Sequence, residues 1–111
     1  MKLSIIIPTL NEADYLSATV RSMRENAVSG GPYEIIIADT GSTDGSQEVS
    51  LALGLKLVRC VKPLPGRASA VNQGAASATG DVLLFLDADT SLPEGYDESL
   101  EEALMNYMVY V

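Results

Sequence analysis

The chain has 111 residues, of which 47% are hydrophobic and 20% charged, so we expect one globular domain with a single modest core. Fifteen acidic residues against seven basic ones give a net charge of -8, which disfavours nucleic acid as a partner. One cysteine and no histidine exclude an internal disulfide, a Cys/His zinc site and histidine-based acid–base catalysis.

Strand patterns alternate with helix patterns along the chain, which predicts an α/β fold with a mainly parallel sheet. The predicted strands are residues 3–7, 34–38, 55–60 and 81–86. The predicted helices are residues 12–26, 44–53, 67–79 and 97–107, and residues 108–111 have strand-like composition. Right-handed crossovers order the first three strands as 3-2-1. If the fourth strand lies on the other side of the first, the order is 3-2-1-4, with helices on both faces and a crevice between the first and fourth strands.

The helices show apolar faces at helical spacing. The face of the first helix carries Leu16, Val20, Met23 and Ala27, and Thr9 or Asn11 is expected to cap it. The inner face of the third is small: Ala68, Val71, Ala75 and Ala78. The fourth carries Leu100, Ala103, Leu104 and Tyr107 on one side. Gly54 follows the second helix, at the position that favours a left-handed residue.

The amino-terminal apolar stretch is stopped by Pro8 without a small-residue cleavage site, so a signal peptide is not expected. No run approaches the roughly 20 apolar residues of a membrane span. We expect a cytoplasmic setting, and peripheral association with a membrane stays open.

Asp87 and Asp89 follow five apolar residues, 82–86, that are typical of a strand buried on both faces. If the chain stays extended, both carboxylates project the same way, about 6 to 7 Å apart. Two such carboxylates can share one Mg²⁺ or Mn²⁺ ion that also bridges a diphosphate. Asp-x-Asp is a short pattern, and an acidic turn after a strand fits it equally well.

Polar loops follow the other strands. Asp39, at the end of the second strand, can accept a hydrogen bond from a nucleobase imide or a ribose hydroxyl. In the loop that follows, Ser42 or Thr43 is expected to cap the next helix. The negative charge of Asp44 is expected to be favoured there by the helix dipole. Arg67 is either a solvated helix start or a cation for a phosphate or a base.

Four segments together resemble the nucleotide-binding half of family 2 glycosyltransferases. They are residues 4–12 (SIIIPTLNE), 34–45 (EIIIADTGSTDG), 66–72 (GRASAVN) and 80–89 (GDVLLFLDAD), in the order and spacing of that family. The resemblance covers about residues 3–93. It implies a Rossmann-like GT-A fold and inverting transfer from a nucleotide-diphosphate sugar, usually a UDP-sugar. A dehydrogenase is disfavoured, because no Gly-x-Gly-x-x-Gly follows the first strand.

The resemblance also implies roles for individual residues. Those of the nucleotide pocket are Pro8, Thr9, Glu12, Asp39, Arg67 and Asp87. Asp39 would hold the base, Arg67 would approach the base or the diphosphate, and Asp87 would lie near the ribose and the donor sugar. Asp89, with Asp87, would hold Mn²⁺ or Mg²⁺.

Members of this family continue past the Asp-x-Asp with an acceptor-binding half that supplies a carboxylate base. We therefore expect residues 1–111 to be a nucleotide-sugar-binding domain truncated before that half, and its catalytic base is unknown. The acidic residues of the last helix are expected to form a solvated face: Asp97, Glu98, Glu101 and Glu102. The alternative is a non-catalytic nucleotide-sugar-binding or assembly module. The open edge of the fourth strand, or exchange of residues 97–111, predicts self-association.

Overall fold

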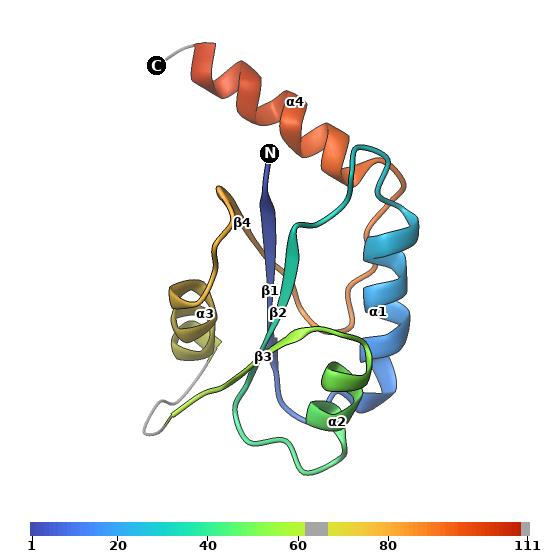
Figure 1. The fold of residues 1–111 in the computed structure, drawn as a ribbon, viewed down its shortest axis with the longest axis vertical. Coiled ribbons are helices and arrows are strands. Elements are labelled where there is room, and N and C mark those ends of the chain that lie inside the picture. Colours follow the sequence, from blue (N-terminus) through green and yellow to red (C-terminus); the bar gives the residue numbers. More distant parts are fainter. Residues whose placement is uncertain (62–66, 110–111) are drawn as a thin grey trace.

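The computed structural model describes residues 1–61 and 67–109 and has the alternating strand and helix order that the sequence predicts (Figure 1). Its elements are β1 (Leu3–Thr9), α1 (Ala13–Glu25), β2 (Glu34–Asp39), α2 (Ser46–Ala52), β3 (Lys56–Arg59), α3 (Arg67–Ala76), β4 (Val82–Phe85) and α4 (Tyr96–Val109). The expected strand-like structure of residues 108–111 was wrong for 108 and 109, because α4 continues through Val109. Residues 110 and 111 lie outside the described residues.

The four strands form a parallel sheet in the predicted order β3-β2-β1-β4. Thr9 lies opposite Asp39, and Ile6 lies opposite Phe85, so β1 is paired along both edges. The chain first winds outward from β1 to β3 and then returns to add β4 on the other side. The carboxyl ends of β1 and β4 therefore meet at a switch point, where α/β sheets bind ligands.

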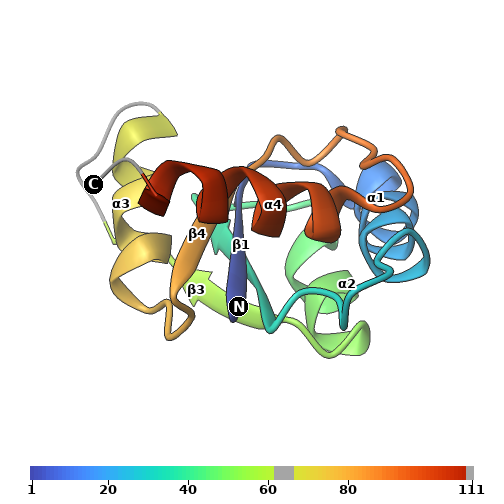
Figure 2. The same ribbon diagram turned by 90° about the horizontal axis from the view of Figure 1, so that it is seen from above.

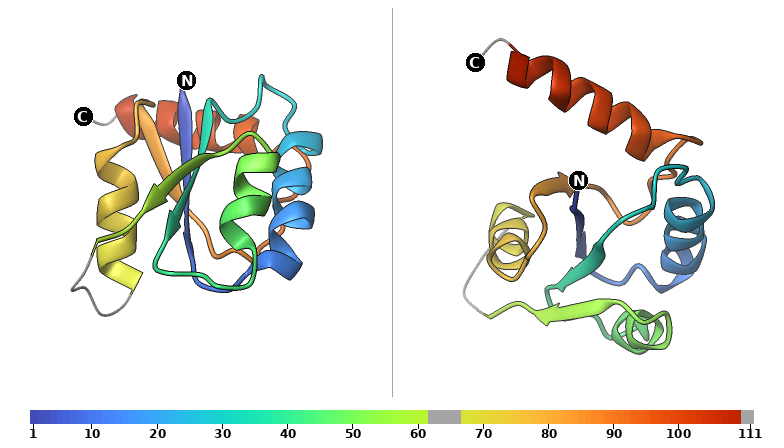
Figure 3. Two further views of the ribbon diagram at one scale, coloured as in Figure 1. Left: turned by 60° about the horizontal axis from the view of Figure 1, so that its bottom comes forward. Right: turned by 45° about the horizontal axis from the view of Figure 1, so that its top comes forward.

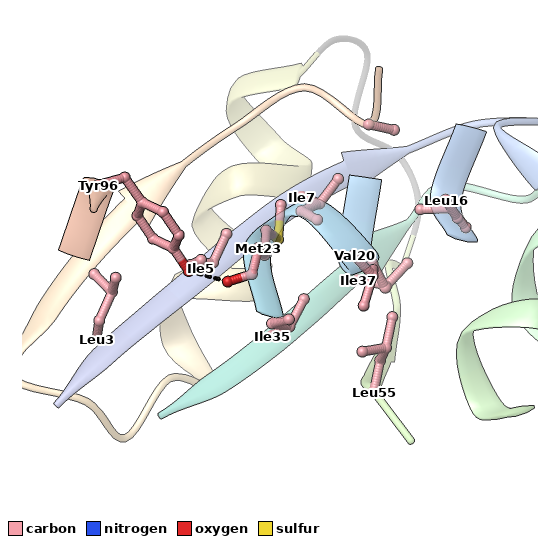
Figure 4. Close-up of a cluster of buried hydrophobic side chains, with 11 residues drawn as sticks. Leu3, Ile5, Ile7, Leu16, Val20, Met23, Ile35, Ile37, Leu55 and Tyr96 are labelled. Carbon is pink, nitrogen blue, oxygen red and sulfur yellow. Dashed lines mark hydrogen bonds between the residues drawn. The ribbon is translucent and has the colours of Figure 1, made fainter. Parts of the chain in front are cut away.

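Helices α1 and α2 cover one face of the sheet, and α3 covers the other (Figure 3). Alternate β1 side chains point to opposite faces, so Ile5 and Ile7 pack with α1 while Ile6 faces α3. The larger core cluster combines these strands with the predicted apolar face of α1, namely Leu16, Val20 and Met23 (Figure 4). Thr19 is also buried on that face, where its hydroxyl donates to the carbonyl of Ala88 at 2.5 Å.

Helix α3 approaches the sheet through Ala70 and Gly74, which are both buried. Ala68, expected on this inner face, is exposed, whereas Val71, Ala75 and Ala78 are part-buried. The approach is closest at Gly74, where a Cβ atom would come within 2.6 Å of Ile6 Cγ2. A side chain any larger than hydrogen would push α3 away from β1.

The prediction that the fourth strand is buried on both faces was wrong, because one face of β4 is exposed. Leu83 is 39% exposed and Phe85 is 45% exposed, whereas Val82, Leu84 and Leu86 pack against the core. β4 is an edge strand, and α3 packs over β1 and β2 instead of over β4. An uninterrupted apolar run therefore did not indicate two covered faces here.

Helix α4 lies across the amino-terminal end of the sheet (Figure 2). A set of polar contacts attaches its first turn to the loop that follows α1. Asp97, expected on a solvated face, is only 2% exposed and accepts hydrogen bonds from the backbone N–H groups of Val28, Ser29 and Gly31 at 2.8 to 3.1 Å. The Tyr96 hydroxyl donates to the carbonyl of Met23 at 2.6 Å (Figure 4), and burial, with the nearby Asp97 charge, raises the pKa of Tyr96 to about 12.

The remaining acidic residues of α4 agree with the prediction better. Glu98 and Glu102 are exposed, and Glu101 is part-exposed and pairs with the amino terminus at 3.6 Å. Leu100 and Leu104 are half-buried, while Ala103 is exposed; the side chain of Tyr107 lies outside the described part of the chain. Within residues 1–61 and 67–109, no helix has both the length and the apolar character that crossing a bilayer requires.

We expect Gly74→Ala to destabilise the fold by about 1–3 kcal/mol, because the added methyl overpacks the contact with Ile6. An exposed helical glycine would show the opposite sign, since alanine is the better helix former. Asn72→Ala, at an exposed position of α3, is the matched control and should be neutral or slightly stabilising. Urea unfolding compares the two, and an increase in stability for Gly74→Ala would contradict the close approach.

We expect Asp97→Asn to lower the free energy of unfolding by about 1.5–3 kcal/mol at pH 7, as for other hydrogen bonds to a charged group. Burial alone would raise the pKa of Asp97, but the backbone hydrogen bonds from Val28, Ser29 and Gly31 outweigh it and lower the pKa. Because the folded-state pKa is below the unfolded value, this stabilisation is present above the unfolded pKa and is lost as pH falls through the folded one. The difference in free energy of unfolding between wild type and Asp97→Asn, measured with urea, should therefore shrink from pH 7 to pH 3. A difference that stays constant over this range would contradict a stabilising role for the ionised Asp97 carboxylate.

Candidate functional site

The loops after β1, β2 and β4 share the carboxyl edge of the sheet. Thr9 and Asp39 are register partners, and the N–H of Thr40 donates to the carbonyl of Thr9 at 3.0 Å. Leu86 donates its N–H to Ile6 at 3.1 Å, so the chain leaves β4 alongside β1. The edge thus brings together the strand ends Pro8, Thr9 and Asp39 with Glu12 and the Asp87–Asp89 pair of the following loops, as predicted.

Asp39 is the most constrained side chain of this edge. It is 1% exposed, and its Oδ1 accepts from the N–H groups of Gly41 at 2.9 Å and Ser42 at 2.8 Å and from Gln47 Nε2 at 2.9 Å. Its Oδ2 accepts from the Ser42 hydroxyl at 2.5 Å. Burial raises the pKa of this carboxyl, but these hydrogen bonds outweigh burial and lower its pKa, so Asp39 is an ionised acceptor at neutral pH.

The amino terminus of α1 is capped by the loop that follows β2. Backbone N–H groups of Asn11, Glu12 and Ala13 donate to Ser42 Oγ at 2.8 Å, Ser46 Oγ at 2.9 Å and Asp44 Oδ2 at 3.0 Å. The expected local caps were wrong: the N-cap residue is Glu12, without a side-chain cap bond, and the Thr9 hydroxyl donates to Ile7 instead.

Asn11 does not cap α1 but accepts a hydrogen bond from the loop that follows β2. Its φ of 55° lies in the left-handed region, which Asn tolerates better than most residues. This turn aims its side-chain oxygen at the N–H of Thr43, at 2.8 Å. This hydrogen bond joins the loop after β1 to the loop after β2 at the carboxyl edge of the sheet.

The expected caps of α2 were also wrong, because its N-cap is Gly45 in a left-handed conformation. Asp44 does lie at this helix start, accepting from the N–H and the hydroxyl of Ser46 at 3.0 and 2.5 Å. The Ser46 hydroxyl and the N–H of Ala13 contribute to the lowered pKa of Asp44. At the other end, Gly54 has φ 75° and follows Leu53 as predicted.

The Asp87–Asp89 segment is a turn, and the assumption of an extended chain was wrong. The N–H of Thr90 donates to the carbonyl of Asp87 at 3.1 Å. Ala88, between the two exposed aspartates, is 3% exposed and is held by the Thr19 hydroxyl. The buried Ala88 anchors the turn, so that the carboxylates flank a fixed point. Both are hard oxygen donors suited to Mg²⁺ or Mn²⁺, although the part of the chain that the structure describes holds no cluster of three or more possible ligands among His, Cys, Asp and Glu.

The remaining predicted site residues lie at the same edge. Pro8 and Glu12 are part-buried, and Thr9 is 2% exposed. α3 begins at Arg67, whose side chain lies outside the described part of the structure. A surface hollow of about 280 Å³, lined by Arg24, Tyr33 and Leu55 among others, lies by the amino end of β2 and not at this site.

Sequence reasoning missed Gln47 and Arg59. Gln47 reaches Asp39 from the first turn of α2, and Arg59 Nε donates to Gln47 Oε1 at 3.0 Å. The available signal was positional: Arg59 ends β3 and is the register partner of Asp39.

The four-stranded parallel sheet of order β3-β2-β1-β4, with helices on both faces, has the GT-A type of fold. The chain belongs to the glycosyl transferase family 2, whose family model matches residues 4–111. The resemblance seen in the sequence is thereby confirmed, as is the GT-A fold.

Similar proteins support this assignment. The chain is 39% identical over 110 residues to a dolichol-phosphate mannosyltransferase of Pyrococcus furiosus, covering 96% of the chain and 31% of that protein. It is 31% identical to a glucosyl-3-phosphoglycerate synthase of Mycolicibacterium smegmatis, covering 82% of the chain and 32% of the relative. A crystal structure of the Mycobacterium tuberculosis synthase with Mn²⁺, UDP and glucosyl-3-phosphoglycerate matches with TM-score 0.68 and 29% identity, over 78% of this chain and 33% of that one. The chain thus spans about a third of the length of the relatives it matches.

We expect Asn11→Ala to destabilise the protein by about 1–3 kcal/mol, since alanine disfavours left-handed backbone and leaves the Thr43 N–H without its acceptor. Asn11→Gly keeps the conformation and should lose only about 1 kcal/mol for the hydrogen bond. Thermal or urea unfolding measures both. Equal stability losses in the two variants would show that the left-handed conformation of Asn11 contributes nothing.

Proposed function

We propose that this chain binds the nucleotide-diphosphate sugar donor, with UDP as its carrier, for an inverting glycosyltransferase. The observation that carries the proposal is the placement of Asp39 and the Asp87–Asp89 turn after β2 and β4, on either side of the β1 end at one edge of the sheet, in a chain that matches a structure with UDP and Mn²⁺. Residues 1–111 are then the nucleotide-sugar-binding domain.

Base recognition falls to Asp39. An ionised carboxylate can only accept hydrogen bonds, and Oδ2, with one donor against three on Oδ1, has a lone pair to spare. A uracil ring offers an imide N–H to such an acceptor. Pro8 and Thr9 at the end of the neighbouring β1, with Glu12 in the loop after it, line the pocket.

The diphosphate needs positive charge, which an acidic chain provides sparingly. Amides at the start of a helix are a common alternative, but those of Asn11, Glu12 and Ala13 already donate to the Ser42–Ser46 loop. This occupancy favours a divalent cation held by Asp89 and Asp87, assisted by Arg67. When bound, Mn²⁺ or Mg²⁺ would neutralise the charge that develops on the departing diphosphate.

The acceptor hydroxyl must lose its proton to attack the anomeric carbon, which calls for a carboxylate base. We assign no such base to this chain. Asp97 is unsuited because it is buried, has a lowered pKa and is bonded to the loop between α1 and the amino end of β2, away from the switch point. The base then comes from an acceptor-binding part, contributed by further polypeptide or by a partner.

We expect UDP affinity to rise on adding Mn²⁺. In Asp89→Asn, UDP affinity in the presence of Mn²⁺ should be about tenfold or more below that of the wild type, because a neutral amide is a poorer ligand for a hard cation. Calorimetric titration with and without chelator measures the effect. Glu102→Gln, an exposed carboxylate on α4, is the matched control and should behave as the wild type. Equal UDP affinity with chelator present would overturn the metal role, and no UDP binding at all would overturn the proposed function.

A further inference from the structure

The side-chain amide of Gln47 has both of its polar ends engaged. Nε2 donates to Asp39 Oδ1 at 2.9 Å, and Oε1 accepts from Arg59 Nε at 3.0 Å. Because the two ends of the amide have opposite hydrogen-bonding character, these partners fix its orientation. A line of contacts therefore runs from the end of β3, through α2, to the end of β2.

The other donors to Asp39 differ from Gln47 in where they come from. Gly41 and Ser42 belong to the loop that directly follows Asp39, which is bonded to the loop after β1 through Asn11. Gln47 lies on α2, and Arg59 is held in the sheet as the register partner of Asp39. Among the described residues that donate to the carboxylate, Gln47 is the one that belongs to a helix, and Arg59 holds Gln47 in turn. Rigid elements position a side chain more accurately than a loop does.

The three bonds on Oδ1 also determine which oxygen is left for a ligand. Among the described residues, Oδ1 accepts from Gly41, Ser42 and Gln47, whereas Oδ2 accepts from the Ser42 hydroxyl alone. Loss of the Gln47 bond would free one side of Oδ1 and let the carboxylate rotate. The acceptor presented to the base would then no longer have a single direction.

We propose that Gln47 and Arg59 are positioning residues that set the base selectivity of the nucleotide site by fixing the Asp39 carboxylate. The inference rests on the proposed function. A fixed, ionised acceptor favours uracil, which carries an N–H at ring position 3, over cytosine, which carries an unprotonated nitrogen there and would repel the carboxylate. A carboxylate free to rotate discriminates less between the two.

The test measures the dissociation constants of UDP and CDP by calorimetry in the presence of Mn²⁺. Gln47→Leu, of similar volume without polar atoms, should lower the ratio of UDP to CDP affinity by about tenfold, the scale of one hydrogen bond to a charged group. Gln47→Glu keeps the acceptor for Arg59 but sets a second carboxylate against Asp39, and should lower the ratio at least as much. Gln73→Leu removes the chain's other glutamine, on α3, and should leave the ratio unchanged.

The ratio separates positioning from a purely structural role, which would change thermal stability and both affinities alike. An unchanged ratio in Gln47→Leu, with UDP still bound, would overturn this inference and leave the proposed function standing. Wild-type protein that binds no UDP would overturn both. If Gln47→Leu does not fold, Arg59→Met, at an exposed position, decides: a lowered ratio supports the inference, and an unchanged one overturns it.

Discussion

The structure depends on the burial of β1. Every residue of Leu3–Thr9 except Pro8 is buried, so this strand needs apolar cover on both faces and a paired strand on both edges. α1 and α3 provide the cover through Leu16, Val20 and Gly74, and β2 and β4 provide the pairing. Because β1 is central and parallel to its neighbours, the loops that follow all three strands open at one end. The position of the site is a consequence of how the core is closed.

The second organising feature is how an acidic chain holds its carboxylates. Asp39, Asp44 and Asp97 each accept hydrogen bonds from backbone N–H groups, and the pKa of each is lowered. With fifteen acidic residues and seven basic ones, backbone amides do much of what lysine and arginine do elsewhere. The same bonds join segments far apart in sequence: Asp44 joins the α2 loop to α1, and Asp97 joins α4 to the loop after α1.

The two ends of the sheet consequently have different roles. At the carboxyl end, the polar loops lock to one another and hold Asp39 as an ionised acceptor. At the amino end, α4 is attached through Asp97 and Tyr96 (Figure 1). On the α3 side of β4, Leu83 and Phe85 are exposed, and self-association through the β4 edge stays a prediction.

The place of β4 beside β1 is decided by the packing of the whole sheet. The sequence by itself determined the strand and helix order, the order 3-2-1 of the first three strands and the place of Asp39 and Asp87 at strand ends, because hydrophobic periodicity is a local property of the chain and crossovers have a fixed hand. It did not predict the caps of α1, the burial of Asp97, the exposure of Phe85 or the contact of Gln47 with Asp39. Each of these depends on a partner more than five residues away or on which neighbour covers a face. Only the packed structure brings such groups within hydrogen-bonding distance.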